Sequence, residues 1–275
     1  MALVTGWPLL RTLWLSLTDA GLVSGDVAPQ WVGLHNYSSA WADPDLREAF
    51  GRTLYFTVVS VTAEVLIAVP VALLLNQPFR GRMLARALLV LPWALPTIVN
   101  AMMWRLILNP EYGSLNALLT QIGWLDAYRS WLGDPDTALN MIIVADVWKN
   151  YPLVALIALA ALQSVPADLY EAARLDGAGP WARFWSVTLP GIAGALSVAV
   201  VLRLIDAFKV FDIIYVMTRG GPADSTKTLS FFVYQESFSY LRAGSGAAYA
   251  VFVTGLCALL ILVYVLLLRR KQGAA

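Results

Sequence analysis

The sequence predicts an all-α protein, a polytopic membrane helix bundle of about six transmembrane helices. Apolar residues make up 59% of the chain and charged residues only 13%, with a mean hydropathy of +0.66, whereas soluble domains carry roughly 25% charged residues. Five apolar runs are long enough to cross the hydrocarbon layer as helices. Because no polar linker or internal repeat separates these runs, we expect residues 1–275 to form a single transmembrane domain with a core at about 50–268.

The first apolar run, Ala2–Leu17, is short and holds Arg11 near its middle. A cleaved signal peptide places its basic residues before the apolar core, so this run is better interpreted as the C-terminal part of a first transmembrane helix that is short or truncated. An interfacial helix is the other alternative. The five longer spans are expected at about 53–75, 85–108, 139–162, 191–217 and 245–268.

Arginine and lysine residues beside the spans indicate the orientation of the chain, because they favour the cytoplasmic side. We place the loop 76–86, the loop 163–190 and the basic tail in the cytoplasm, so that both termini are cytoplasmic and the protein is multi-pass. The margin is eight basic residues against six. The eight are Arg80, Arg82, Arg86, Arg174, Arg183, Arg269, Arg270 and Lys271, and the six are Arg47, Arg52, Arg129, Arg219, Lys227 and Arg242.

Several classes of function lack their sequence features. The net charge of +1 provides no basic field for nucleic acid. A single cysteine, Cys257, excludes an intrachain disulfide, and a single histidine, His35, excludes HExxH and histidine-based triads. No GxxxxGK[ST] motif occurs. We therefore expect no catalytic residue, no metal site and no cofactor in this chain, and any ATP must bind to another subunit.

The loop at 163–190 between the fourth and fifth spans is the most informative segment. Asp168 precedes apolar positions that predict a short helix near the membrane surface, and Gly177 and Gly179-Pro180 are expected to end it. An aromatic face follows at Trp181, Phe184 and Trp185. Such a segment can fit into a groove on a partner protein, or it can simply lie against lipid headgroups.

The spacing of this loop resembles the EAA loop of permease subunits in binding-protein-dependent, ATP-driven (ABC) importers. The pattern runs from Glu171-Ala172-Ala173 through three residues to Gly177, and then through nine residues to Val187 and Leu189-Pro190. Val187 stands where the family usually has Ile. The resemblance implies the type I ABC importer permease fold and a loop that couples the permease to its ATPase. The coupling residues are Glu171, Ala172, Ala173, Asp176, Gly177, Val187, Leu189 and Pro190.

Further motifs are similar to the sugar and polyol branch of this family, the maltose- and glycerol-phosphate-type permeases. They are Val32 to Tyr37 in an outer segment, Trp148 to Pro152 in the fourth span, and Phe208 to Asp212 with Thr218 to Pro222. The resemblance implies import of a sugar, oligosaccharide or polyol across a prokaryotic inner membrane. It also implies a second, non-identical permease, two ATP-binding subunits that hold ATP and Mg, and an extracytoplasmic solute-binding protein.

Polar residues inside the spans are costly in lipid and are candidates for the solute pathway. The fifth span carries Arg203, Asp206, Lys209 and Asp212 at i, i+3 spacing, so neighbouring charges can pair along one helix. They can line a pathway, or they can neutralise one another as a brace between helices. The pathway candidates are Asn100, Asp146, Trp148, Asn150, Tyr151, Asp206, Lys209, Asp212 and Tyr215.

Two alternative functions remain open on the sequence alone. A self-sufficient secondary carrier would use Asp206, Lys209 and Asp212 as an ion-coupled relay, and it would need no ATPase. An ABC permease for a non-sugar solute would share the coupling loop but would act with a different binding protein.

Overall fold

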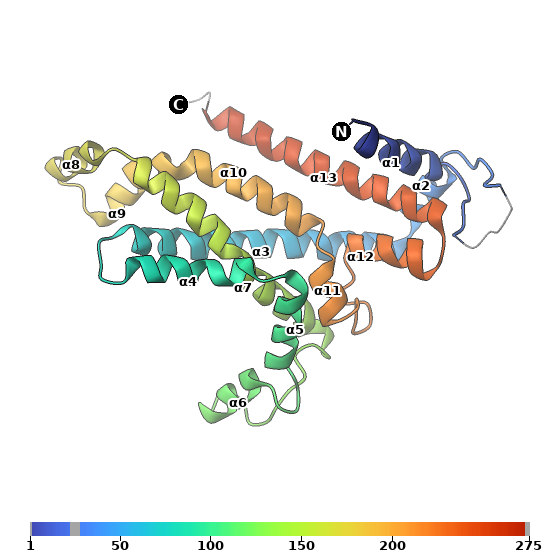
Figure 1. Cartoon of the computed structure of the whole chain (residues 1–275), viewed down its shortest axis with the longest axis horizontal. Helices are drawn as coiled ribbons and strands as arrows, with labels where there is room; N and C mark the ends of the chain where they lie inside the picture. The colour runs from blue at the N-terminus through green and yellow to red at the C-terminus, as the bar shows by residue number, and fades with distance from the viewer. Residues whose placement is uncertain (1, 23–27, 273–275) are drawn as a thin grey trace. The chain divides into compact units, whose positions relative to one another are not determined.

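The computed structural model describes residues 2–22 and 28–272, and within these ranges it consists of helices and their connections, without a strand (Figure 1). Four of the described helical segments are long and apolar enough to cross a membrane. They are Pro44–Asn76 (α3), Pro135–Ser164 (α7), Pro180–Phe208 (α9, η1 and α10) and Ala243–Leu266, which is part of α13 (Ala243–Gln272). The all-α membrane fold is confirmed.

The span expected at 85–108 is broken in two. Arg82–Ala94 (α4) and Thr97–Ile107 (α5) meet at an angle of 94° and together can form a fifth span or a re-entrant loop. Pro96 causes the break, because its nitrogen cannot donate to the helix and its ring disfavours helical backbone at the preceding residue. Leu95 is accordingly extended, with φ −71° and ψ 136°. Pro92 and Pro152, by contrast, lie inside the continuous helices α4 and α7.

The span expected at 191–217 ends earlier than the sequence predicts. Helix α10 (Leu189–Phe208) ends at Phe208, and a separate short helix, α11 (Asp212–Met217), follows. Hydropathy alone could not locate this end, because apolar residues resume at 213–217 after the charged positions Lys209 and Asp212. At the N-terminus, α1 (Ala2–Leu15) has 14 residues and is too short to count as a span by length.

Shorter helices form the connections between the long ones. They are α2 (His35–Ala42), α6 (Ser114–Gln121), α8 (Ala167–Leu175), α9 (Pro180–Arg183), the π-helix η1 (Phe184–Thr188), α12 (Leu229–Tyr234) and the π-helix η2 (Gln235–Ser239).

The helices group into two compact units. The first comprises residues up to Phe56, residues 132–139 and the chain from Phe208 on, and the second comprises residues 57–131 and 140–207. The expectation of one transmembrane domain over residues 1–275 stays a prediction.

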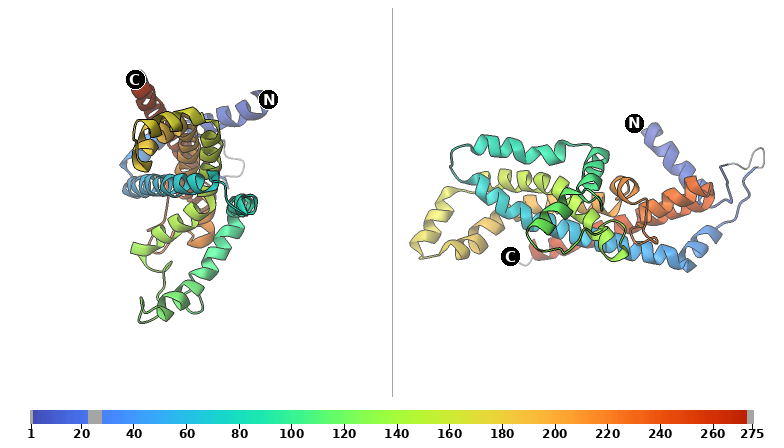
Figure 2. Two further views of the ribbon diagram at one scale, coloured as in Figure 1. Left: turned by 90° about the vertical axis from the view of Figure 1, so that its left-hand side faces the viewer. Right: turned by 90° about the horizontal axis from the view of Figure 1, so that it is seen from below.

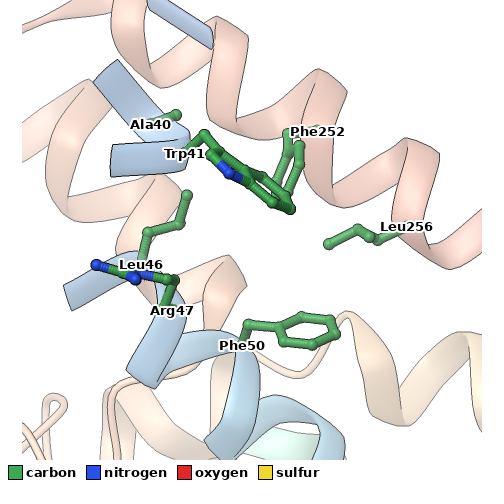
Figure 3. A pocket seen from close by; sticks show the side chains of 7 residues that line it. All are labelled: Ala40, Trp41, Leu46, Arg47, Phe50, Phe252 and Leu256. Carbon is green, nitrogen blue, oxygen red and sulfur yellow. The ribbon is translucent and has the colours of Figure 1, made fainter. Parts of the chain in front are cut away.

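The first unit packs α2, α12 and the start of α3 against α13. Phe208, Leu229 and Phe232 are buried in its core together with Cys257. A small apolar pocket of about 160 Å³ lies between these helices, where the Trp41 ring meets Phe252 edge to face at 6.2 Å (Figure 3).

The second unit packs the remainder of α3 with α4, α7 and α10. Its core includes Ala68, Ala72, Ala155, Ala158 and Ala199, all fully or almost fully buried. Small side chains let helix backbones approach closely, which is the main source of helix association in lipid. The turn between α3 and α4 lies at the same end of this unit as α8 and α9 (Figures 1 and 2).

Candidate functional site

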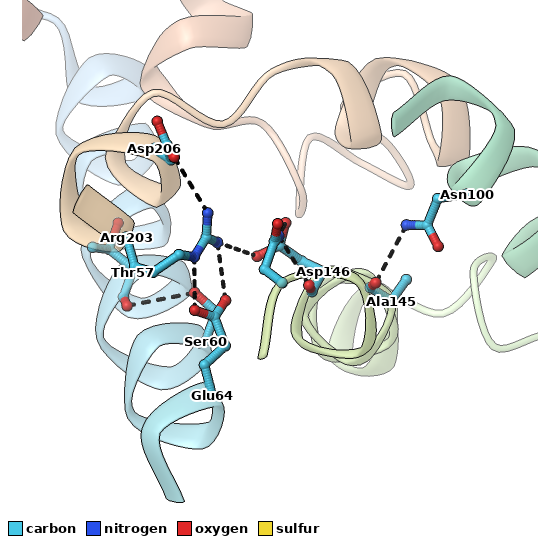
Figure 4. Close-up of polar contacts among 9 residues, drawn as sticks. Thr57, Ser60, Glu64, Asn100, Ala145, Asp146, Arg203 and Asp206 are labelled. Atoms are coloured by element: carbon cyan, nitrogen blue, oxygen red, sulfur yellow. Dashed lines mark hydrogen bonds and ion pairs between the residues drawn. The ribbon is translucent and has the colours of Figure 1, made fainter. Parts of the chain in front are cut away.

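A buried ionic cluster joins three helices within the second unit (Figure 4). Arg203 on α10 forms a two-pronged hydrogen bond to Glu64 on α3, with Nε donating to Oε2 at 2.7 Å and Nη2 to Oε1 at 2.9 Å. The same Nη2 donates to Asp146 Oδ2 on α7 at 3.2 Å. The Glu64 side chain is fully buried and that of Arg203 is 5% exposed. Charged side chains can be buried only when an opposite charge and hydrogen bonds offset the loss of hydration, as they do here.

Two amides extend this cluster. Asn150, one turn after Asp146 on α7, donates from Nδ2 to Asp146 Oδ1 at 2.9 Å. Asn100 on α5 donates to the carbonyl of Ala145 at 3.3 Å, and its own Oδ1 finds no hydrogen-bond partner among the described residues. Asn100 is completely buried, so a polar atom of this side chain is left without compensation.

Asp206 is the exposed member of the cluster. Its carboxylate lies 3.5 Å from Arg203 Nη1, as the i, i+3 spacing predicts, but its side chain is 61% exposed. The predicted ladder does not continue along the helix, since α10 ends before Lys209. Lys209, Asp212 and Tyr215 belong to the first compact unit and are described there.

A cleft of about 450 Å³ lies beside α7 in the second unit. Trp148 and Tyr151, both predicted pathway residues, line it together with Trp104 of α5. The two tryptophan rings meet edge to face at 6.2 Å. Trp104 Nε1 is buried and has no hydrogen-bond partner among the described residues. The cleft therefore combines aromatic faces with an unpaired donor.

In the first unit, the predicted residues surround an aromatic cluster. Tyr215 on α11 stacks on Phe211 with ring centres 5.4 Å apart, and it meets Tyr234 of α12 at the same distance. A hydrogen bond to Tyr215 raises the pKa of the Tyr234 phenol. Lys209 and Asp212 are exposed.

The loop at 163–190 contains the predicted short helix. Helix α8 has no buried residue, and Leu175 at its end is 89% exposed. Gly177, with φ +77°, ends the helix in the left-handed conformation that glycine adopts without strain. The amides of Gly177 and Ala178 bond back to the carbonyls of Arg174 and Ala173, which is the Schellman arrangement.

The second half of the loop leads directly into the apolar helix α10. Gly179 precedes Pro180 at the first position of α9, and the chain then widens into the π-helix η1 before Pro190. In a regular α-helix the ring of a proline clashes with the carbonyl group four residues earlier, and the wider turn of a π-helix relieves this clash. Val187 and Leu189 are half-buried, whereas Glu171, Ala172, Asp176 and Pro190 are exposed and Ala173 is half-buried. The coupling role of all these residues stays a prediction.

The pairing of Glu64 with Arg203 is the feature that the sequence pattern missed. Both residues are recognisable as ionisable groups within apolar spans, and their opposite charges indicate that they could pair. Their separation of 139 positions gives no indication that they meet. Within the described residues, no group of three or more side chains has the composition of a metal site.

Comparisons with known proteins identify the class of this membrane protein. A family model described as "Binding-protein-dependent transport system inner membrane component" matches residues 64–273, and the chain belongs to this family. It is 41% identical over 238 residues to the trehalose/maltose transport system permease protein MalF of Thermococcus litoralis, covering 86% of this chain and 78% of the relative.

Two further comparisons agree with this assignment. The sulfoquinovosyl glycerol transport system permease protein SmoG of Agrobacterium fabrum is 34% identical over 272 residues, which cover 99% of this chain and 87% of the relative. The fold matches a chain of the bacterial alginate ABC transporter in complex with alginate pentasaccharide-bound periplasmic protein. The TM-score is 0.83 at 22% identity, over 98% of this chain and 90% of that one.

Proposed function

We propose that this chain is the permease subunit of an ATP-driven importer that moves a sugar, oligosaccharide or polyol delivered by an extracytoplasmic solute-binding protein. The exposed helix α8, held between two membrane-spanning helices and carrying the Glu171-to-Gly177 pattern, is the observation that carries the ATP-driven part. The solute class is supported by the names of the relatives, which include permeases for trehalose, maltose and sulfoquinovosyl glycerol.

The loop 163–190 is proposed to be cytoplasmic and to receive motion from the ATPase. Helix α8 offers Leu175, 89% exposed, on the same face as Glu171 four positions earlier, and Leu169 is 50% exposed. An exposed apolar side chain beside a charge fits an apolar groove with a polar rim. The stop at Gly177 makes the segment short and stiff, so that a displacement of α8 reaches the start of α10 through the π-helix.

The proposed solute pathway runs past the buried cluster and the aromatic cleft of the second unit. Asp206 offers an exposed carboxylate, and Trp148 and Tyr151 offer apolar faces for the C–H surface of a sugar. Asn100 and Asn150 are buried beside the cluster and stay pathway candidates. Glu64 and Arg203 are buried and hydrogen-bonded to each other, so we assign this pair a positioning role that holds Asp146 and Asp206. Lys209, Asp212 and Tyr215 remain pathway candidates of the first unit.

The partners follow from the family and are part of the proposal. They are a second, non-identical permease, two ATP-binding subunits that carry ATP and Mg, and the solute-binding protein. We place the chain in a prokaryotic inner membrane with both termini in the cytoplasm. The side chains of the basic tail, Arg269 to Lys271, lie outside the described residues. A secondary carrier is disfavoured by the family and by the end of α10 before Lys209, which interrupts the relay on one helix.

Affinity purification in mild detergent tests the proposal. The tagged chain should retain an ATPase and a second permease from native membranes, and the eluate should hydrolyse ATP. Glu171→Arg should lose the ATPase while remaining in the membrane. Glu111→Arg, which makes the same change at an exposed position of an outer segment, should retain it. A wild-type chain that purifies alone and without ATP hydrolysis would contradict the proposal.

A further inference from the structure

A second apolar cavity of the second unit has no role in the proposed function. It is a groove of about 670 Å³ between α3 and the segment that runs from α9 through η1 into α10. Leu66, Val69 and Leu73 of α3 form one wall, and Trp181, Phe184 and Trp185 form the other. No charged side chain lines it.

The aromatic wall keeps its shape through contacts among its own rings. Trp181 stacks on Phe184 with centroids 5.9 Å apart, and Trp185 meets both rings edge to face at 5.8 and 5.4 Å. Trp181 is nevertheless 72% exposed and Trp185 53% exposed, and Leu66 on the opposite wall is 68% exposed. An apolar surface of this size is normally covered by something.

The location of the groove identifies the medium that covers it. Both walls belong to helices long and apolar enough to cross a membrane, and only 22% of the apolar window in Pro180–Phe208 is buried within the chain. Tryptophan side chains are typical of the boundary between hydrocarbon and headgroups. A hydrocarbon chain is the chemical match for an apolar groove between two membrane-spanning helices.

Cationic side chains follow directly after the α3 wall of the groove in the chain. Arg80 in the turn after α3 and Arg82 at the start of α4 are exposed, and no acid lies in residues 77–82. Arg183 lies within the aromatic wall segment, and its buried Nε has no hydrogen-bond partner among the described residues. The nearby acids, Asp168, Glu171 and Asp176, lie on or directly after α8. A guanidinium group is well suited to a phosphate oxygen, and basic residues beside a span attract anionic lipid.

We propose that this groove is a binding site for an anionic phospholipid, with one acyl chain between α3 and the aromatic wall and the phosphate at the arginine-bearing end. A bound chain would brace α3 against the segment that we propose couples to the ATPase. Lipid occupancy itself does not depend on that function, so the binding test below and the ATPase test above can fail independently.

Photolabelling of the complex purified from native membranes and placed in lipid nanodiscs tests the site. The probe is phosphatidylglycerol with a diazirine at the end of one acyl chain, and labelled peptides are mapped by mass spectrometry. We expect label on residues 64–76 and 180–196. Val69→Trp, which fills the groove, should lose most of this label. Leu74→Trp, at a 59% exposed position of α3 outside the groove, should retain it.

A second variant and a second lipid probe complete the photolabelling experiment. Leu66→Trp serves as a second filling variant at an already exposed side chain, should Val69→Trp fold poorly. The matching phosphatidylcholine probe should label the groove more weakly, and equal labelling would overturn the anionic preference. Unchanged label in both filling variants, or label no stronger than on the exposed Leu259 and Leu262 of α13, would overturn the site. A groove that stays unlabelled because a partner protein covers it would also overturn it.

Discussion

Arg203 is the residue on which the buried charges of the second unit depend. Its guanidinium contacts three carboxylates, and two of them, those of Glu64 and Asp146, are buried on other helices. A buried ion pair adds little net stability over an apolar pair of the same shape, whereas a buried charge without its partner is strongly unfavourable. The cluster is therefore better understood as a positional constraint than as a source of stability.

Arg203→Met tests this interpretation. It removes the ion-pair partner of Glu64 and leaves Asp146 with only the attraction of Lys149, and we expect a loss of about 3–5 kcal/mol of stability. The double variant Arg203→Met/Glu64→Leu should recover part of this loss, because the unpaired buried Glu64 carboxylate is then removed. The fraction of tagged protein that stays monodisperse in mild detergent after heating provides the measurement. A single variant as stable as wild type would show that the cluster is solvated in the membrane protein.

Gly177 is a second residue at which one effect, the backbone conformation, can be tested separately from side-chain packing. Its φ of +77° is left-handed, and a Cβ at this position would meet nothing within 4 Å, so a substitution acts through the backbone alone. Gly177→Val should cost about 1–2 kcal/mol locally and shift the end of α8. Gly177→Asn, a residue that tolerates this conformation, should cost less.

The measurement for Gly177 is the ratio of solute uptake to ATP hydrolysis in the reconstituted complex. We expect Gly177→Val to lower this ratio clearly and Gly177→Asn to remain close to wild type. Equal ratios in both variants would show that the geometry at the end of α8 does not matter for coupling.

Among the helices, the approach of α7 to α10 depends on another glycine. A Cβ at Gly191 would lie 2.8 Å from Cγ2 of Val165, just beyond the end of α7. Gly191→Ala should therefore destabilise the junction by about 1 kcal/mol, within the range for overpacking, and Val165→Ala should restore it. Gly194→Ala, where a Cβ meets nothing within 4 Å, is the matched control. Thermal stability in detergent distinguishes the three, and an unaffected Gly191→Ala would exclude a tight junction.

The helices themselves could be predicted because apolar length is a local property. Helix breaks were harder, since the sequence does not distinguish Pro96, which turns the chain between α4 and α5, from Pro92 and Pro152, which lie inside helices, and hydropathy does not show where α10 ends. The EAA-type loop was predictable from the fixed spacing of Glu171, Gly177 and Pro190. The Glu64–Arg203 contact was not, because pairing between two helices distant in the sequence is a property of the packed structure.

For the whole molecule, the predicted orientation gives a direct labelling experiment. The chain has one native cysteine, Cys257, which is buried, so background labelling should be low. Leu175→Cys and Trp124→Cys place thiols at side chains that are 89% and 79% exposed. In intact cells, a membrane-impermeant maleimide should label Trp124→Cys and not Leu175→Cys. Inside-out vesicles should reverse the result, and the opposite pattern would invert the topology.

The energy source of the assembled transporter separates the two classes of function that the sequence left open. Because the chain belongs to the binding-protein-dependent family and its charged ladder ends with α10, uptake should require ATP and a binding protein rather than an ion gradient. Proteoliposomes containing the purified complex should accumulate labelled maltose or trehalose, the first probes suggested by the 41% identical relative. Omission of ATP or of the binding protein should reduce uptake to background, whereas ionophores that collapse proton and sodium gradients should leave it unchanged. Uptake by this chain alone that ionophores abolish would instead assign transport to an ion-coupled carrier.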